Sequence, residues 1–186
     1  MTNYSMKHSR RHFLYSMAHL AVTGVALSLA PSAFAAKPGS RSLTFAHTHT
    51  GEKLHIVYAS GNQYVPGALK TLNRFLRDHY TGQIGRMDPK LFDLLYRLRL
   101  TLGSNEPFEI VSGYRCPATN TKLRRKGGGG VAKRSLHMEG KALDLRLPDV
   151  SLTDLRDAAK ASRKGGVGFY PQDGFVHVDT GAVRSW

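Results

Sequence analysis

The chain has 186 residues and a formal net charge of +14, because 27 lysines and arginines face 13 acidic residues. A protein this basic is attracted to polyanions, among them nucleic acid, anionic lipid surfaces and the bacterial cell wall. Its one cysteine, Cys116, excludes a fold held by internal disulfide bonds.

The first 35 residues have the features of an export signal. Residues 9–14 read S-R-R-H-F-L, which matches the twin-arginine pattern S-R-R-x-F-L. A mildly apolar run over residues 17–30 follows, and residues 33–35 have the small-x-small form of a cleavage site. The run is shorter than the roughly twenty apolar residues that cross a bilayer, so we expect no stable membrane insertion. The sequence predicts a twin-arginine signal peptide over residues 1–35.

Residues 36–186 then form the expected mature domain, long enough for one hydrophobic core. Removal of three basic residues with the signal leaves this domain at a net charge of +11. Export places it in the periplasm, where nucleic acid is not the expected partner. The basic surface therefore favours the cell wall as a partner.

The first half of the mature chain predicts two strands followed by two helices. Residues 43–46 and 53–58 have strand character. Apolar residues keep helical spacing from residue 66 to residue 79. A second helix opens at Asp88-Pro89, with the aspartate as N-cap and the proline in the first turn. Its predicted buried stripe is Leu91, Leu94, Leu95 and Leu98.

The second half begins with a predicted strand over residues 108–111 and a short polar helix over residues 117–126. Residues 142–147 alternate between leucines and other residues. This alternation predicts a strand with the leucines toward the core and Asp144 on the opposite face.

A last helix and strand complete the expected domain. Ser151 caps a helix that runs to about residue 162 and ends at Gly165-Gly166. Residues 175–179 predict a strand with two valines on one face and His177 and Asp179 on the other. The whole pattern predicts an α+β domain with helices packed on a mostly antiparallel sheet.

Three ionisable residues suggest a metal site. Asp144 and His177 each lie on the polar face of a strand, and burying such a group unpaired costs several kcal/mol. His137 precedes Asp144 on a turn that contains glycine. Two imidazoles and one carboxylate suit zinc with an open coordination position for water. The alternative is that each residue has an ordinary structural role. His137 would then be a loop histidine, Asp144 a surface carboxylate and His177 a hydrogen-bonded core histidine.

The sequence motifs around these residues resemble those of a known family. Residues 135–144 fit S-x-H-x-x-G-x-A-x-D, residues 177–179 read H-V-D, and residues 112–115 read S-G-Y-R. Over residues 112–186 the chain resembles the zinc D-Ala-D-Ala-type peptidases, and within them the periplasmic murein endopeptidase branch. The resemblance implies a Hedgehog/D-Ala-D-Ala-peptidase-like fold, one zinc ion per chain and peptidoglycan as the substrate.

The resemblance also implies roles for single residues. His137, Asp144 and His177 become the zinc ligands, and Ser135 supports the first ligand from outside the coordination shell.

The S-G-Y-R motif carries a second set of expectations. Its arginine, Arg115, holds substrate and stabilises charge in the transition state by this resemblance, and a guanidinium beside the metal suits both tasks. The alternative is one more surface arginine in a basic protein. Tyr114 either lines the cleft or packs against the core.

The general base is where the sequence departs from the family pattern. Related enzymes place an acidic residue three positions before the last histidine ligand, or a histidine two positions before it. Here those positions hold Gly174 and Phe175. Asp179 is the predicted base and Asp173 the second choice. A structural role for Asp179, orienting His177 or Arg115, is the equal alternative.

Other reactive residues are expected to be structural. His47 and His49 form an H-x-H pair without an acidic partner at ligand spacing, which indicates strand residues near the cleft and no second metal site. Glu139 is expected to be solvated. Cys116 is expected to be a small buried residue, although a cysteine peptidase with His137 or His177 as base is the rival mechanism.

The predicted activity is metal-assisted hydrolysis, and the resemblance implies that it cuts peptide cross-links in peptidoglycan, with links between two diaminopimelate residues as the expected target. One alternative is a zinc D,D- or L,D-carboxypeptidase that trims stem peptides. The other is a non-catalytic, zinc-stabilised domain that binds the cell wall.

Overall fold

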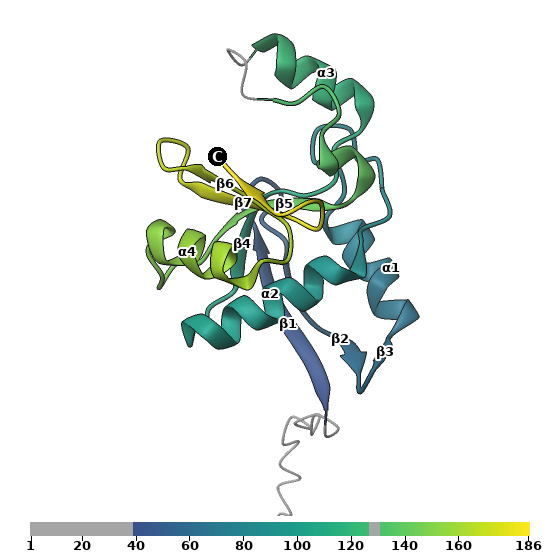
Figure 1. Ribbon diagram of the computed structural model, residues 1–186. Coiled ribbons are helices and arrows are strands. Elements are labelled where there is room, and N and C mark those ends of the chain that lie inside the picture. The colour runs from purple at the N-terminus through teal and green to yellow at the C-terminus, as the bar shows by residue number, and fades with distance from the viewer. Residues whose placement is uncertain (1–38, 127–130) are drawn as a thin grey trace, which may run out of the picture. The chain divides into compact units, whose positions relative to one another are not determined.

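The structure is a computed structural model that describes residues 39–126 and 131–186 (Figure 1). The predicted signal peptide, residues 1–35, lies outside the described residues. Within the described part, no helix is long and apolar enough to cross a membrane.

A single mixed sheet organises the described residues. Its eight strands follow the order β3-β2-β1-β4-β5-β7-β6-β8, and all neighbours are antiparallel except β1 with β4 and β6 with β8. The strands are β1 (Ser40–His47), β2 (Lys53–Ser60), β3 (Gln63–Tyr64), β4 (Phe108–Ser112), β5 (Ala142–Arg146), β6 (Gly166–Tyr170), β7 (Phe175–Asp179) and β8 (Arg184–Ser185).

Four α-helices and one short 3-10 helix accompany the sheet in the described ranges. They are α1 (Pro66–Phe75), α2 (Pro89–Leu102), α3 (Pro117–Lys126), η1 (Leu136–Glu139) and α4 (Leu152–Ser162). Helices α2 and α4 pack against each other and against the sheet, whereas α3 stands apart at one end of the domain (Figure 1). The predicted α+β class with a mostly antiparallel sheet is confirmed.

The core lies between the sheet and its helices. The predicted stripe of α2 is buried, with Leu91 and Leu95 fully inaccessible to solvent. Each such leucine stabilises the fold by about 1.5–3 kcal/mol relative to an exposed one. The start of α2 also matches the prediction, because the Asp88 side chain accepts from the Lys90 amide, and Gly103 ends the helix with φ 65°.

The end of α1 differs from the sequence prediction, whereas α4 ends at the predicted residue but with an unpredicted C-cap. Helix α1 ends at Phe75 because Asp78 forms a turn, in which its carboxylate accepts from the amides of Tyr80 and Thr81. Helix α4 ends at Ser162, and Arg163 adopts the left-handed conformation with φ 49°.

The pair Gly165-Gly166, predicted as a helix end, has a different purpose. A Cβ on Gly165 would lie 1.7 Å from the carbonyl oxygen of Asp179, and a Cβ on Gly166 would lie 2.5 Å from the Asp179 carboxylate. Only glycine allows β6 to start this close to the end of β7. Strand β6 itself was not predicted.

Candidate metal centre

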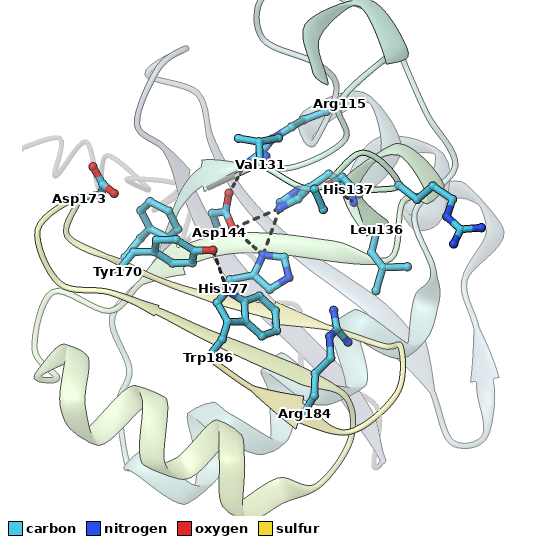
Figure 2. A pocket seen from close by; sticks show the side chains of 14 residues that line it. Arg115, Val131, Leu136, His137, Asp144, Tyr170, Asp173, His177, Arg184 and Trp186 are labelled. Carbon is cyan, nitrogen blue, oxygen red and sulfur yellow. Dashed lines mark hydrogen bonds and ion pairs between the residues drawn. The ribbon is translucent and has the colours of Figure 1, made fainter. Parts of the chain in front are cut away.

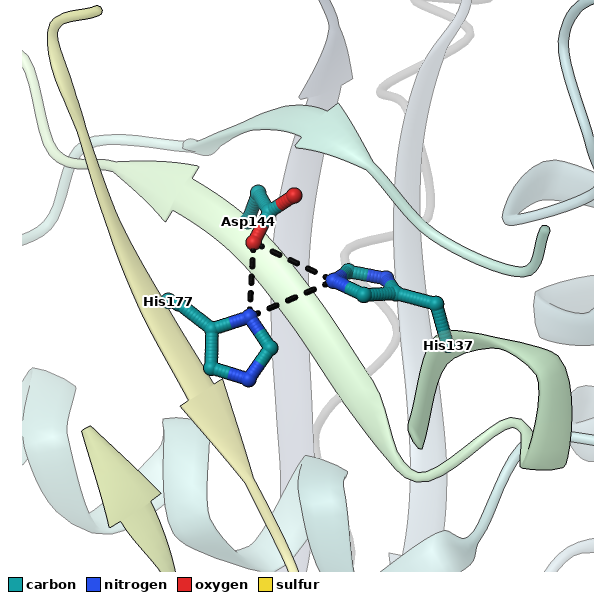
Figure 3. Close-up of side chains that lie close together, drawn as sticks. All are labelled: His137, Asp144 and His177. Atoms are coloured by element: carbon teal, nitrogen blue, oxygen red, sulfur yellow. Dashed lines mark hydrogen bonds and ion pairs between the residues drawn. The ribbon is translucent and has the colours of Figure 1, made fainter. Parts of the chain in front are cut away.

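Asp144 and His177 are brought together by the register of two strands. They are directly opposed partners on the antiparallel strands β5 and β7, so their side chains emerge side by side on one face of the sheet. Nδ1 of His177 lies 2.8 Å from Oδ1 of Asp144 (Figure 3). Both residues are buried, with 3% of Asp144 and 9% of His177 exposed.

His137 reaches the same point from η1, which precedes β5. Ser135 caps this short helix, and its hydroxyl accepts from the His137 amide at 3.4 Å. Gly140 ends it with φ 66°, and a Cβ there would lie 2.0 Å from the carbonyl oxygen of Arg86. The tight start and stop fix the His137 ring so that its Nε2 lies 3.2 Å from Asp144 Oδ1.

Hydrogen bonds on the outer side of each ring decide which nitrogen faces the centre. Nδ1 of His137 lies 2.7 Å from the carbonyl oxygen of Gly113, and Nε2 of His177 lies 3.2 Å from Oδ2 of Asp179. Both oxygens are acceptors, so each of these nitrogens carries the proton of a neutral ring. The inner nitrogens, 3.2 Å apart, then present lone pairs to each other and to the Asp144 carboxylate.

Three electron-pair donors that converge in this way repel one another unless a cation lies between them. The candidate ligand atoms of His137, Asp144 and His177 all lie within 4.8 Å of one another, and the three residues are buried. An outer acceptor that holds the second nitrogen of a ligand histidine is the usual arrangement around protein-bound metals. The donor set therefore fits a metal ion with three protein ligands.

Electrostatics keep the carboxylate ionised. Burial opposes ionisation of Asp144, but His137, His177 and Arg115 outweigh it and hold the carboxyl pKa well below its usual range. Burial lowers the pKa of His137, and the Asp144 charge offsets only part of this shift. The centre thus contains the Asp144 anion beside the neutral imidazole of His137, whereas burial is outweighed at His177 by its hydrogen bonds to Asp144 and Asp179, which raise the pKa of that ring. Metal binding would release the proton from its inner nitrogen.

Arg115 lies against the same carboxylate. Its guanidinium pairs with Oδ2 of Asp144, and its Nε donates to the Ser112 hydroxyl at 2.8 Å. Its backbone amide donates to the His137 carbonyl at 3.2 Å. Arg115 therefore connects the S-G-Y-R turn with two of the candidate ligands and is more than a surface arginine.

Asp179 lies on the far side of His177 from the candidate ligand atoms and is fully buried. Its carboxylate accepts from the amides of Gly166 and Gly181, both at 2.8 Å, and from Arg184 at 2.7 Å. Burial would raise the pKa of this carboxyl, but the His177 ring and these donors hold it well below its usual range. The geometry supports a role in orienting His177.

The predicted role of Asp179 as general base stays a prediction and has no geometric support. The Asp179 side chain is not part of the cavity that contains the candidate ligands.

The chain is similar to known proteins over most of its length. Residues 35–186 match the family model described as peptidoglycan L,D-endopeptidase MepK. The chain is 44% identical over 172 residues to peptidoglycan L,D-endopeptidase MepK of Escherichia coli strain K12, covering 90% of this chain and 94% of the relative. It is 41% identical over 173 residues to the probable peptidoglycan L,D-endopeptidase MepK of Haemophilus influenzae, covering 90% and 92%. The chain belongs to the MepK family.

In this MepK-family chain the three candidate ligands open onto a cavity of about 300 Å³ (Figure 2). One wall is aromatic and comes from Tyr170, Phe175 and Trp186. Nε1 of Trp186 donates to the Tyr170 hydroxyl at 2.8 Å, and the Trp186 ring centre lies 5.3 Å from that of His177. Arg115, Arg134, Arg184 and Asp173 are the charged lining residues besides the candidate ligands.

The aromatic wall was missed by the sequence analysis. Trp186 reaches the cavity because β8 pairs in parallel with β6 and because Gly168 has no side chain. A Cβ on Gly168 would lie 2.8 Å from the rings of both Trp186 and Tyr170. The only sequence signal was the lone tryptophan of the chain, a residue that is enriched where binding energy is concentrated.

Tyr114 and Cys116 lie outside the cavity lining. The ring of Tyr114 packs over Gly85, where a Cβ would lie 2.1 Å from it, so substrate contact by Tyr114 has no support in the geometry. Cys116 is 1% exposed, and its thiol contacts Thr119 and Thr81, with no histidine among its described partners. A cysteine-peptidase mechanism therefore has no structural basis.

Glu139 is exposed and pairs with Lys141 at 2.8 Å, in line with a solvated residue. His47 and His49 also lie outside the cavity and form a ring cluster with His79. Among the residues that the structure describes, His137, Asp144 and His177 are the only group of three or more possible ligands whose ligand atoms converge.

Proposed function

We propose that this protein is a zinc-dependent murein endopeptidase that hydrolyses peptide cross-links of peptidoglycan. The observation that carries the proposal is the convergence of His137 Nε2, Asp144 Oδ1 and His177 Nδ1 at the floor of an open cavity. Membership of the MepK family supports the reaction class, and the names of the relatives support L,D links as the bond. Links between two diaminopimelate residues are the proposed substrate.

Zinc is the proposed metal, with one ion per chain. Two imidazole nitrogens and one carboxylate oxygen are a common ligand set of catalytic zinc, and three protein ligands leave one position open. When bound, zinc supplies Lewis-acid polarisation of a carbonyl and activates a water nucleophile at neutral pH.

Residues of the chain position the metal ligands, stabilise charge and bind the substrate. His137 and His177 are held by Gly113 and Asp179 in the tautomers that metal binding needs. Arg115 is positioned to donate to the oxyanion that develops on the scissile carbonyl, or to a stem-peptide carboxylate. The aromatic wall is positioned to pack against the bound peptide and to exclude water from that side of the cleft.

The proton acceptor must lie in the cavity with the substrate. Asp144 and Asp173 are the acidic residues of the cavity lining, and Asp144 is committed to the metal centre. We therefore assign Asp173 as the proposed general base and Asp179 as a positioning residue for His177. Both assignments are open to the test described at the end of the Discussion.

The proposed site of action is the periplasm, reached through the twin-arginine pathway. The S-R-R-H-F-L motif of residues 9–14 and the small-x-small cleavage-site pattern of residues 33–35 support this route. Nucleic acid is not a proposed partner, because exported protein does not meet it in the periplasm.

Incubation of the mature protein with defined cross-linked muropeptides tests the function. An endopeptidase converts dimers into monomers, and the reaction should stop with a chelator and resume when zinc is restored. Shortened monomers without loss of dimers would identify a carboxypeptidase. Binding to sacculi without any product would identify a non-catalytic wall-binding domain.

A further inference from the structure

A long stretch of the chain around the cleft carries positive charge only. Between Glu109 and Glu139 the sequence has no acidic residue and seven lysines and arginines. Arg115 is paired with Asp144. The other six are exposed and form no ion pair with any residue that the structure describes. We call them the basic rim: Lys122, Arg124, Arg125, Lys126, Lys133 and Arg134.

The basic rim borders the proposed catalytic cavity. Helix α3 carries four of its members and is tied to the segment that follows, because Nδ2 of Asn120 donates to the carbonyl of Ala132 at 3.2 Å. Ala132 and Arg134 both line the cavity. The helix is also fixed at its start, where the Cys116 amide donates to the Asp78 carboxylate at 2.8 Å. The rim is thus a fixed feature beside the cleft.

Fold stability does not explain this concentration of charge. Thr119 and Asn120 are the buried residues of α3, so the helix adds little to the core. Four cations within residues 122–126 repel one another across the helix surface. The carboxylate beneath the helix, Asp78, is 1% exposed, and its oxygens accept from backbone amides. The outer face of α3 therefore presents uncompensated positive charge to solvent.

We propose that the basic rim is an exosite for peptidoglycan, which binds free carboxylates of stem peptides next to the cross-link in the cleft. The inference rests on the proposed function, since it takes the same polymer as the substrate. A cavity of about 300 Å³ holds only the residues around the scissile bond, so further contacts must lie outside it.

Stem peptides suit the rim because they repeat carboxylates along an extended mesh. One exposed ion pair stabilises a complex by about 0.2–1 kcal/mol at most, but several that act together raise the effective affinity for a multivalent polymer. Guanidinium groups also bind carboxylates in two-point geometry. The rim would retain the enzyme on its insoluble substrate between cleavage events.

The test neutralises three rim residues that do not line the cavity, with the variant Arg124→Gln/Arg125→Gln/Lys126→Gln. A matched control removes the same charge near the end of α4 with Lys160→Gln/Arg163→Gln/Lys164→Gln, whose residues also lie outside the cavity lining. Zinc-loaded proteins are compared for co-sedimentation with sacculi and for turnover of sacculi and of soluble cross-linked dimers.

We expect the rim variant to bind sacculi about 3- to 100-fold more weakly at low ionic strength, with the control close to wild type. The difference should shrink at 0.5–1 M salt, where the Debye length is only about 3–4 Å. Sacculi whose carboxylates have been amidated should bind wild type and rim variant equally. Turnover of soluble dimers should stay within about twofold of wild type, because the cavity is intact.

Equal losses in the rim variant and the control would overturn the proposal in favour of a net-charge effect. Unchanged binding of the rim variant, or a matching loss on soluble dimers, would also overturn it. Co-sedimentation is also measured with vesicles that contain an anionic phospholipid. If the rim variant loses binding only to these vesicles and not to sacculi, the rim is assigned to a membrane surface instead. Failure of wild type to cleave any dimer would remove the proposed function, yet co-sedimentation would still report on the rim.

Discussion

Asp144 and His177 face each other across a single antiparallel register, and this pairing places two of the three candidate metal ligands side by side. Neighbouring side chains at opposed positions lie close enough for one ion to contact both. The third group, His137, comes from a short helix whose start and end are fixed by Ser135 and Gly140. The candidate centre therefore depends on the sheet for two candidate ligands and on a short helix for the third.

The first prediction is loss of metal from His177→Ala and from Asp144→Ala. Each change removes one of three converging ligand atoms, and a two-ligand site holds zinc far more weakly. Elemental analysis of purified protein should find about one zinc per wild-type chain and much less in either variant. Asp173→Ala serves as the control, because it removes a cavity carboxylate outside the ligand group. Full zinc content in His177→Ala would contradict the proposed centre.

Trp186 is expected to determine substrate affinity. Its ring packs against His177 and is fixed by the Tyr170 hydroxyl. Trp186→Ala removes most of the aromatic wall and should raise KM about tenfold or more, since burial of an aromatic ring contributes about 1.5–3 kcal/mol. Trp186→Phe keeps the wall but loses the hydrogen bond and should recover most of the affinity. Steady-state kinetics on cross-linked dimers measure both. Equal KM values for all three proteins would show that the wall does not touch substrate.

The elements with strong local signals were predictable from sequence. Helix α2 has an aspartate cap and a proline in its first turn, so its start matches the prediction, and β7 alternates cleanly and matches its predicted bounds. Strand β6 reads Gly-Val-Gly-Phe-Tyr, whose glycines suggest a loop. It forms because it pairs with β7, which is a tertiary effect. Strand β8 has two residues, too few for any periodicity to appear.

In the candidate site, too, some features follow from local sequence signals and others depend on tertiary structure. The convergence of His137, Asp144 and His177 was predictable because each residue lies in a motif or on the polar face of a strand. Alternation along β7 places Asp179 beside His177 but does not say which ring nitrogen it contacts. The carbonyl of Gly113 was invisible in the sequence, because any residue supplies a carbonyl and only the fold brings this one to His137. Contacts made by the backbone leave no signature in residue type.

Stability should fall in mildly acidic solution because of His47. Burial, followed by the neighbouring rings of His79 and His49, lowers the pKa of His47 to about 4, whereas an unfolded histidine titrates near 6.5. Glu52 opposes the shift and Arg77 adds to it. The folded state therefore binds fewer protons than the unfolded state between these values. Its stability is complete above pH 6.5 and is lost progressively as the pH falls to 4.

Denaturant unfolding at pH 7.0 and pH 4.5 tests this pH dependence. The wild-type loss attributable to His47 should be on the order of 1–3 kcal/mol, and His47→Gln should reduce it. His55→Gln, at an exposed histidine on β2, is the control and should leave the loss unchanged. An identical pH dependence in wild type and His47→Gln would rule out this histidine as the cause.

Export should require both arginines of the signal motif. Changing Arg10 and Arg11 to lysine keeps the charge but removes the twin-arginine pattern. The precursor should then accumulate in the cytoplasm, as cell fractionation and immunoblotting would show. The control is Lys7→Arg, which leaves the motif intact. Normal periplasmic levels of the double-lysine variant would mean that another route exports the protein.

Variants of Asp179 and Asp173 give the sharpest test, because their effects distinguish a positioning residue from a general base. Asp179 holds the outer nitrogen of His177, so Asp179→Asn should weaken zinc binding about 10- to 100-fold, the usual effect of losing such a partner. Excess zinc should then restore much of the activity. Asp173→Asn should keep zinc but lose about 10²–10⁴-fold in kcat, the usual contribution of a positioned base.

The two carboxylates are distinguished by metal titration and kcat measured on the same preparations. A base at Asp179 would reverse the pattern: Asp179→Asn would retain zinc at wild-type affinity and lose turnover that no added zinc restores, while Asp173→Asn would remain active. The pH profile adds an independent criterion. Loss of the acidic limb of kcat in Asp173→Asn, but not in zinc-saturated Asp179→Asn, is the expected outcome, because only the proton acceptor has to ionise for turnover.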